Sequence, residues 1–332
     1  MRLKYNILWF DDDTDWIESV EDDIQEFLLE NGFILNFDNH KNAQKLDTLI
    51  TDMKNNTKDV DIILMDYKLL NHDKGDILIK KIRQQEVLTE ILFYSQDAAV
   101  RNKFKEECIE GIYFSNRSDF LDRLFQIIPH TIKKVLDLTN MRGLVMAETS
   151  TLDLLLNDVL INMFSVLDKH DSCRRQEIID KVFHKRLKHA HSIKEIEHEK
   201  IKRKGKDDLE FKVNTKNKEE YISDISLLLE NIESSDRFQA VNKLYKIINK
   251  KVEVDSSKFD IFKKYDDEII KIRNILAHVH EEVIDGKTVL KSKVRGYNKF
   301  TFSHTEFEKI RKSLILHSDN IKKLDLEICK NL

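Results

Sequence analysis

The chain has 332 residues, of which 35% are charged and 41% hydrophobic, and its formal net charge is −4. This length suits two domains that each bury a core, and a content of 7 Gly and 1 Pro indicates a helix-rich protein with few tight turns. The composition excludes a collagen-like, disordered or disulfide-stapled chain, and the slight acidity argues against a general nucleic-acid coat.

The 3 cysteines are widely spaced and include no Cys-x-x-Cys pair, which is typical of a reducing cytosol. The sequence enters a strand pattern at once, without a signal-peptide core, and has no long uncharged apolar stretch. We therefore expect a cytoplasmic protein with no membrane partner. The segment Lys181–Lys218 is rich in Lys and Arg, a pattern more typical of a solvated face than of a phosphate-binding surface.

Short apolar runs alternate with amphipathic patterns from residue 5 to about residue 128. The runs predict strands at Tyr5–Phe10, Ile34–Asp38, Ile62–Met65, Ile91–Tyr94 and Ile112–Phe114. Helical spacing predicts helices at Trp16–Asn31, Gln44–Met53, Gly75–Gln85, Ala99–Ile109 and Ser118–Ile128. Five strands alternating with five helices predict a doubly wound, parallel five-stranded sheet that is covered on both faces.

Carboxylates follow two of these runs. Asp11, Asp12 and Asp13 come after the first run, and Asp66 comes after the third. The carboxyl ends of parallel strands meet at one edge of a sheet, where open α/β folds place their sites, so we expect these carboxylates to share a small space. Their mutual repulsion favours a hard divalent cation such as Mg²⁺. A solvated turn in which Asp13 caps the next helix would explain the triple aspartate alone, but not its occurrence together with Asp66.

Residues 1–128 resemble a response-regulator receiver domain, which has a flavodoxin-like five-stranded fold. The resemblance rests on Asp11-Asp12 after the first strand, Asp66 after the third, Gly75 at the start of the next helix and Ser95 after the fourth strand. It implies that Asp66 is the nucleophile that accepts a phosphoryl group from a histidine kinase or another phosphoryl donor.

The resemblance also implies further roles around the phosphoacceptor. The implied Mg²⁺ ligands are Asp11, Asp12, Asp66 and the backbone carbonyl of Lys68. The Ser95 hydroxyl would bond a phosphoryl oxygen, and its movement would let the aromatic ring of Tyr113 swing inward.

Some positions depart from the receiver pattern. The family ends its fifth strand with Lys-Pro, whereas the segment 113–118 contains no lysine and offers Arg117 as the nearest cation. Leu70 replaces the usual proline after the nucleophile strand, and Gln96 is bulkier than the small residue expected after Ser95. A phosphate-independent pseudo-receiver therefore stays an alternative.

Residues 129–332 read as an all-α helical bundle with a small β-hairpin, because the strand signal nearly vanishes after Pro129. Helical spacing of apolar residues runs through Thr131–Leu167, Ile222–Ile248 and Phe259–Val279. Asp285-Gly286 between two apolar runs predicts the hairpin turn. A last helix is expected from about Thr305, a candidate cap.

Arg273, Asn274 and His278 form the clearest polar motif of this half. At helical spacing Asn274 and His278 share a face that Arg273 borders. Histidine can move a proton near neutral pH and arginine can hold a phosphate, so the set suits cleavage of a phosphodiester by a ribose 2′-hydroxyl. The loose pattern of an Arg followed by a His after four to six residues also occurs elsewhere, as at Arg311 and His317, so an ion-paired surface or interface histidine in an inert bundle stays an alternative.

The segment around Arg273 resembles the HEPN superfamily of helical bundles, since among the Arg-to-His copies only Arg273 is followed by Asn and lies late in an amphipathic helix before a hairpin and a final helix. The resemblance implies a metal-independent endoribonuclease that acts on RNA as a homodimer, with one cleft built by both protomers. His278 would be general acid or base, Arg273 would stabilise the pentavalent phosphate, and Asn274 would orient the substrate or the histidine.

The two resemblances together predict a phosphorylation-responsive signalling protein, in which a receiver domain (residues 1–128) controls a ribonuclease domain (residues 129–332) in stress response or antiphage defence. The alternative is a non-enzymatic response-regulator adaptor whose helical half dimerises and binds a protein partner. DNA binding is not favoured, because no pair of helices reads as a recognition motif.

Overall fold

The computed structural model describes residues 3–106, 109–135, 138–171, 175, 177–183, 225–230, 232–279, 281–284, 287–290, 300–301 and 303–332. The chain forms two compact units. The first consists of Met1–Leu144 with His280–Lys312, and the second consists of Val145–Val279 with Ser313–Leu332. The basic segment predicted to be solvated lies outside the described residues from residue 184 onward.

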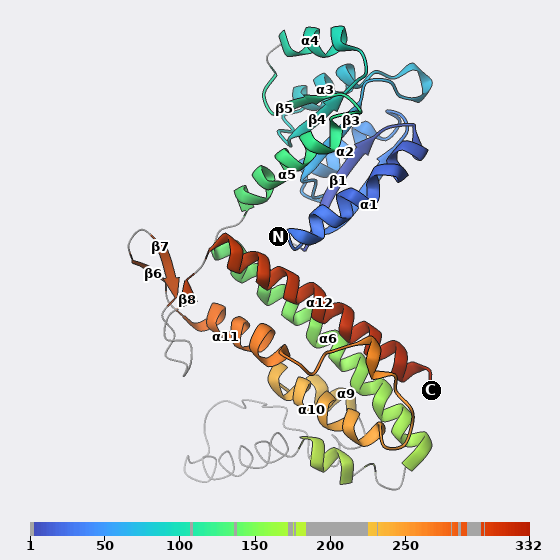
Figure 1. Cartoon of the computed structure of the whole chain (residues 1–332), viewed down its shortest axis with the longest axis vertical. Coiled ribbons are helices and arrows are strands. Elements are labelled where there is room, and N and C mark those ends of the chain that lie inside the picture. Colours follow the sequence, from blue (N-terminus) through green and yellow to red (C-terminus); the bar gives the residue numbers. More distant parts are fainter. Residues whose placement is uncertain are drawn as a thin grey trace, which may run out of the picture. The chain divides into compact units, whose positions relative to one another are not determined.

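Five parallel strands build the sheet of the first unit in the order β2-β1-β3-β4-β5 (Figure 1). The strands are β1 (Lys4–Phe10), β2 (Ile34–His40), β3 (Ile62–Asp66), β4 (Ile91–Tyr94) and β5 (Ile112–Ser115). The helices between and after them are α1 (Thr14–Glu30), α2 (Leu46–Lys54), α3 (Gly75–Gln84), α4 (Ala98–Glu106) and α5 (Phe120–Val135). This is the flavodoxin-like doubly wound order, so the predicted fold class is confirmed.

Neighbouring residues of each central strand enter different cores. Trp9, Leu64 and Tyr94 pack with α1 and α5 on one face of the sheet. Phe10 and Phe93 pack with α2 and α3 on the other face. Successive side chains of a strand point to opposite faces, so a strand covered on both sides must be apolar throughout. Both cores thus explain the continuous apolar runs of the sequence.

Helix α5 continues past Ile128, where the sequence predicted its end, and contains Pro129. A proline inside a helix removes one backbone hydrogen bond and disfavours a regular turn. Ile127, Ile128 and Ile132 are buried around it in the sheet core. Burial of these side chains offsets the lost bond, and the helix runs on to Val135.

The remainder of the described chain is mostly helical, as predicted. Its helices are α6 (Leu138–Asp171), α9 (Ile225–Glu230), α10 (Ser234–Ile248), α11 (Lys271–His278) and α12 (His304–Cys329). A π-helical turn at Asp266–Ile270 leads directly into α11. The predicted helix over Phe259–Val279 therefore starts late, because Lys264 has a left-handed backbone (φ 63°) that a continuous helix cannot contain.

A three-stranded antiparallel sheet contains the predicted hairpin. Its strands are β6 (Glu281–Ile284), β7 (Lys287–Leu290) and β8 (Phe300–Thr301). Ile284 pairs with Lys287, as a two-residue turn requires, although Asp285-Gly286 lies outside the described residues. The sequence did not predict β8. At the start of α12, the Ser303 hydroxyl accepts a hydrogen bond from the Glu306 amide, so Ser303 is the cap in place of Thr305.

Helix α6 contains a segment, Leu138–His170, that is long and apolar enough to cross a membrane by length and composition, and no other helix of the described ranges has this property. Its side chains supply much of a helical core. The fully buried ones include Leu156, Val159, Leu160 and Met163. Of the apolar window of this helix, 44% is buried within the protein.

Candidate functional site

Asp11, Asp12 and Asp66 meet at the carboxyl edge of the parallel sheet. A carboxylate oxygen of each lies within 4.8 Å of the others. Strands β1 and β3 are parallel neighbours in which Phe10 pairs with Met65, and the next residue of each is therefore an aspartate at the same edge. A pocket of 660 Å³ opens there, lined by Asp12, Asp13, Asp66, Tyr67, Lys68, Ser95, Gln96, Asp97 and Arg117.

We call this pocket, together with Asp11 behind it, the acidic pocket. Asp11 is the most buried of the three clustered aspartates and has no exposed surface. Its Oδ1 accepts a hydrogen bond from the Asp13 amide (2.8 Å), and its Oδ2 accepts one from the Tyr94 hydroxyl (2.6 Å). Burial raises the pKa of Asp11, and the hydrogen bond from Tyr94 is the largest opposing effect. The sequence did not predict a role for Tyr94 in this site, because Tyr94 ends an apolar run, which is typical of a core residue.

Asp66 ends β3 and keeps only 9% of its surface exposed. Burial raises the pKa of Asp66 to about 7, and the negative charge of Asp11 adds to the increase. A carboxylate in such a position is stabilised by any cation that enters the pocket. The three aspartates offer the hard oxygen ligands that Mg²⁺ prefers, so the residues present fit this ion.

Arg117 is the cation beside these carboxylates in the part of the chain that the structure describes. Its Nη1 donates to Asp13 Oδ2 (2.6 Å), while Nη2 lies 3.4 Å from Asp11 Oδ1 and 3.8 Å from Asp66 Oδ2. The guanidinium carbon is 4.7 Å from the centre of the Trp16 ring. Stacking and a planar fork of donors suit arginine and not lysine. The structure thus brings Arg117 into the pocket, with its closest contact at Asp13.

Ser95 is buried at the pocket, and its hydroxyl accepts a hydrogen bond from the Asp97 amide (3.1 Å). Tyr113 lies instead on β5, half-buried against the core that contains Tyr94. The guanidinium carbon of Arg123 is 5.6 Å from the centre of its ring. Ser95 therefore lines the pocket, whereas Tyr113 does not line it and pairs with Leu92 of β4 in the sheet.

The loop after β3 passes very close to Asp66 and requires a glycine. A Cβ atom on Gly75 would lie 2.1 Å from the carbonyl oxygen of Asp66. The Gly75 amide donates to the Tyr67 carbonyl (2.9 Å), and Lys68, which lines the pocket, pairs with Lys74 in an isolated bridge. These bonds close the loop that carries the expected carbonyl ligand.

Arg273, Asn274 and His278 lie together on α11 in the second unit. Arg273 Nη1 donates to Asn274 Oδ1 (3.0 Å), and the Arg273 Nε is buried with no hydrogen-bond partner. Asn274 and His278 are exposed, one helical turn apart. The structure therefore keeps the predicted polar face accessible, with His278 as the last residue of the helix.

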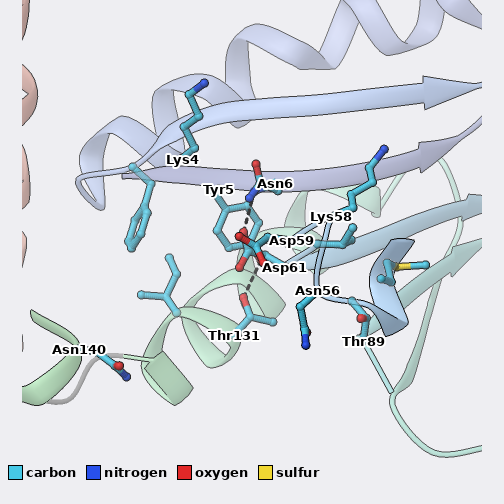
Figure 2. Close-up of a pocket in the computed structure, with 14 residues that line it drawn as sticks. Lys4, Tyr5, Asn6, Asn56, Lys58, Asp59, Asp61, Thr89, Thr131 and Asn140 are labelled. Atoms are coloured by element: carbon cyan, nitrogen blue, oxygen red, sulfur yellow. Dashed lines mark hydrogen bonds between the residues drawn. The ribbon is translucent and has the colours of Figure 1, made fainter. Parts of the chain in front are cut away.

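A second cavity of 390 Å³ lies at the opposite, amino edge of the parallel sheet (Figure 2). The Tyr5 hydroxyl and Thr131 Oγ1 are 2.6 Å apart, and the Asn6 amide donates to Asp61 Oδ2 (2.7 Å). None of the site residues predicted from the sequence lines this cavity. The first of these bonds joins two side chains, and the second joins the backbone of Asn6 to a side chain.

No protein-family model and no curated protein matches this sequence. Among solved structures, the receiver domain of the Francisella response regulator 1452 is 17% identical, with a TM-score of 0.30, over 40% of this chain and 98% of that chain. A receiver domain protein (CheY-like) from Methanospirillum hungatei JF-1 is 19% identical, with a TM-score of 0.29, over 40% of this chain and 98% of that one.

The signal receiver domain of a putative LuxO repressor from Vibrio parahaemolyticus is 14% identical, with a TM-score of 0.28, over 40% of this chain and 92% of that chain. At these identities and TM-scores the likeness adds nothing to the fold that the strand order already defines.

Replacing Gly75 by Ala should lower the free energy of unfolding by roughly 2–4 kcal/mol, because the new methyl group overlaps the Asp66 carbonyl and the loop must shift. Both tryptophans of the chain, Trp9 and Trp16, lie in the first unit, so urea unfolding followed by tryptophan fluorescence reports on this unit. Gly143→Ala is the matched control, since its Cβ would have no neighbour within 4 Å. Equal stability of both variants would contradict the close approach.

The raised pKa of Asp66 makes a prediction about pH. A carboxyl group whose pKa is higher in the folded state contributes stability at low pH and loses it as the pH rises through the folded value, here about 7. In EDTA, Asp66→Asn should unfold like wild type near pH 4 and be about 2–4 kcal/mol more stable than wild type at pH 8. Urea unfolding at both pH values measures this, and a difference that does not grow with pH would refute it.

Proposed function

We propose that residues 1–128 form a receiver domain in which Asp66 accepts a phosphoryl group from a histidine kinase or another phosphoryl donor. The observation that carries the proposal is the cluster of Asp66 with the buried Asp11 and the half-buried Asp12, beside Arg117, at the carboxyl edge of a sheet with flavodoxin-like strand order. The proposal also divides the chain into two functional parts, a receiver domain of residues 1–128 and a helical domain of residues 129–332.

The chemistry follows from the positions of the side chains. A carboxylate oxygen of Asp66 attacks phosphorus and forms a new O–P bond, while the bond from phosphorus to the donor breaks and its electron pair leaves with the donor. Mg²⁺, held by Asp11, Asp12, Asp66 and the carbonyl of Lys68, supplies positive charge for the carboxylates and the phosphoryl oxygens when it is bound.

The neighbouring side chains have separate tasks in this proposal. Arg117 Nη2 lies 3.8 Å from Asp66 Oδ2 and would bind an oxygen of a phosphoryl group on Asp66. The Ser95 hydroxyl bonds another phosphoryl oxygen, and Tyr113 responds to its movement. A phosphorylated Asp66 thereby changes the surface beside β4 and β5, which is the signal.

Acetyl phosphate with Mg²⁺ should phosphorylate the wild-type chain, because the pocket provides both nucleophile and metal ligands. Phos-tag electrophoresis should show a slower band that is absent in Asp66→Asn and in EDTA. Asp61→Asn, at the other edge of the sheet, should behave as wild type. An unmodified wild-type protein under these conditions would identify a phosphate-independent pseudo-receiver.

We further propose that the helical part, residues 129–332, is a metal-independent HEPN-type endoribonuclease that the receiver controls. Three observations support it: the exposure of Asn274 and His278, the hydrogen bond that joins Arg273 to Asn274, and the π-helical turn directly before α11. Such turns are frequent at functional sites.

The proposed cleavage uses the RNA itself as nucleophile. His278 of one protomer acts as the base and removes the 2′-hydroxyl proton, and the 2′ oxygen then attacks the adjacent phosphorus. The bond from phosphorus to the 5′ oxygen breaks, and His278 of the other protomer acts as the acid that protonates this leaving oxygen. Arg273 stabilises the added negative charge on phosphorus, and Asn274 orients the histidine or the RNA. A homodimer would place two such faces in one cleft, and a role in stress response or antiphage defence in the cytoplasm is an analogy to the superfamily.

The alternative is a non-enzymatic adaptor whose helical part dimerises and binds a protein partner. Large apolar side chains of the second unit that lie exposed favour it, namely Leu154, Ile161, Leu316 and Leu326. These residues lie on α6 and α12, and either a second copy or another protein would cover them.

Incubation of total RNA with phosphorylated and unphosphorylated protein separates the two proposals. The ribonuclease predicts cleavage in EDTA that leaves 2′,3′-cyclic phosphate ends, falls at least about 100-fold in His278→Ala, and spares DNA. His130→Ala is the matched control, since His130 is also exposed and follows Arg123 at a similar spacing. Absence of cleavage by wild type in both phosphorylation states would favour the adaptor.

A further inference from the structure

A chain of hydrogen bonds runs from the buried core into the acidic pocket through Tyr94. Trp9 Nε1 donates to the Tyr94 hydroxyl (2.8 Å), which donates to Asp11 Oδ2 (2.6 Å). All three residues have no exposed surface. An indole N–H can only donate, so the Tyr94 oxygen must accept from Trp9 and its single proton is directed to Asp11. The direction of the chain is therefore fixed by the chemistry of its first member.

Asp11 is held on both of its oxygens by this chain and by the backbone. The Asp13 amide bonds Oδ1 (2.8 Å), and Asp13 itself is fixed because its carboxylate caps α1 at the Trp16 amide (3.1 Å). Each carboxylate oxygen keeps a second lone pair on the side of the pocket, where Arg117 Nη2 lies 3.4 Å from Oδ1 and 3.5 Å from Oδ2. The orientation of Asp11 is thus set by protein donors alone.

Tyr94 and Ser95 are consecutive residues with different surroundings. Ser95 lines the pocket, whereas the Tyr94 ring packs in the core against Trp16 (5.3 Å between ring centres) and Phe120 (5.0 Å). The ring is held by aromatic neighbours on α1 and α5, so the hydroxyl has little freedom to follow Asp11 to another position.

We propose that Tyr94 is a positioning residue of the metal site, which holds the Asp11 carboxylate in the orientation that binds Mg²⁺; this inference rests on the proposed phosphoacceptor function. Mg²⁺ demands near-ideal octahedral geometry and dehydrates reluctantly, so a ligand with a fixed orientation binds it better than one that rotates. Donors behind a metal ligand typically account for a factor of about 10–100 in metal affinity.

Tyr94→Phe tests the proposal, because it keeps the ring and removes only the hydroxyl. Tyr5→Phe is the matched control, since Tyr5 also has a buried hydroxyl on this sheet, bonded to Thr131 at the opposite edge. Both full-length variants keep both tryptophans, so Mg²⁺ affinity is measured by tryptophan fluorescence. Acetyl phosphate labelling of Asp66 is then measured across a range of Mg²⁺ concentrations.

We expect Tyr94→Phe to need about tenfold more Mg²⁺ for half-saturation in both assays and to reach the wild-type extent of phosphorylation at saturating Mg²⁺. Tyr5→Phe should bind Mg²⁺ as wild type does, although either variant can lower the urea midpoint in EDTA. An unchanged Mg²⁺ affinity in Tyr94→Phe overturns the positioning role and leaves the proposed function intact.

A measurement on the wild type does not depend on how well the variant folds. Addition of Mg²⁺ should shift the NMR signal of the Trp9 indole N–H, because a cation at Asp11 polarises the hydrogen bonds behind it. A stationary indole signal at saturating Mg²⁺ would overturn the inference. A wild-type protein that binds no Mg²⁺ and accepts no phosphoryl group would overturn the proposed function and this inference with it.

Discussion

The parallel pairing of β1 with β3 is the constraint on which the acidic pocket depends. It brings Asp11 and Asp66 to one edge of the sheet, where burial raises the pKa values of both carboxyl groups and the negative charge of Asp11 raises the pKa of Asp66 further. Neighbouring groups stabilise these negative charges. The Tyr94 hydroxyl and the Asp13 backbone amide donate hydrogen bonds to Asp11. Arg117 contacts Asp11 and Asp13 and lies 3.8 Å from Asp66. A further cation that binds in this pocket would stabilise the carboxylates in their charged form.

Arg117 places a positive charge beside the carboxylates with a defined geometry. A lysine at the end of the fifth strand would present a mobile point charge, whereas the guanidinium is fixed by stacking on Trp16 and by its bond to Asp13. Positive charge is therefore present beside Asp66 in a defined orientation. The missing lysine by itself is no argument against phosphorylation.

Arg273/His278 and Arg311/His317 show that similar Arg-to-His patterns in sequence can have different surroundings in the structure. Arg311 is fully buried in the first unit, where it donates to the Asn31 carbonyl (2.8 Å), and its burial lowers its pKa to about 10. His317 is buried in the second unit beside Glu268 (3.0 Å). Asn274 and His278, in contrast, are exposed on one helix. Burial thus assigns Arg311 and His317 to the framework and leaves the α11 face accessible to a partner molecule.

The five-stranded fold and the cluster of Asp11, Asp12 and Asp66 could be predicted from the amino-acid sequence, because apolar runs buried on both faces and the carboxylates that follow them are local signals. Tertiary structure alone decided the role of Tyr94, which reads as a core residue until its hydroxyl is placed against Asp11, 83 positions away in the chain. It also decided that Arg117 contacts Asp13, that Gly75 touches the Asp66 backbone, and that α5 continues through Pro129. Each of these features depends on contacts between segments far apart in sequence or on burial that outweighs a local preference. A local sequence pattern predicts neither the contacts nor the burial.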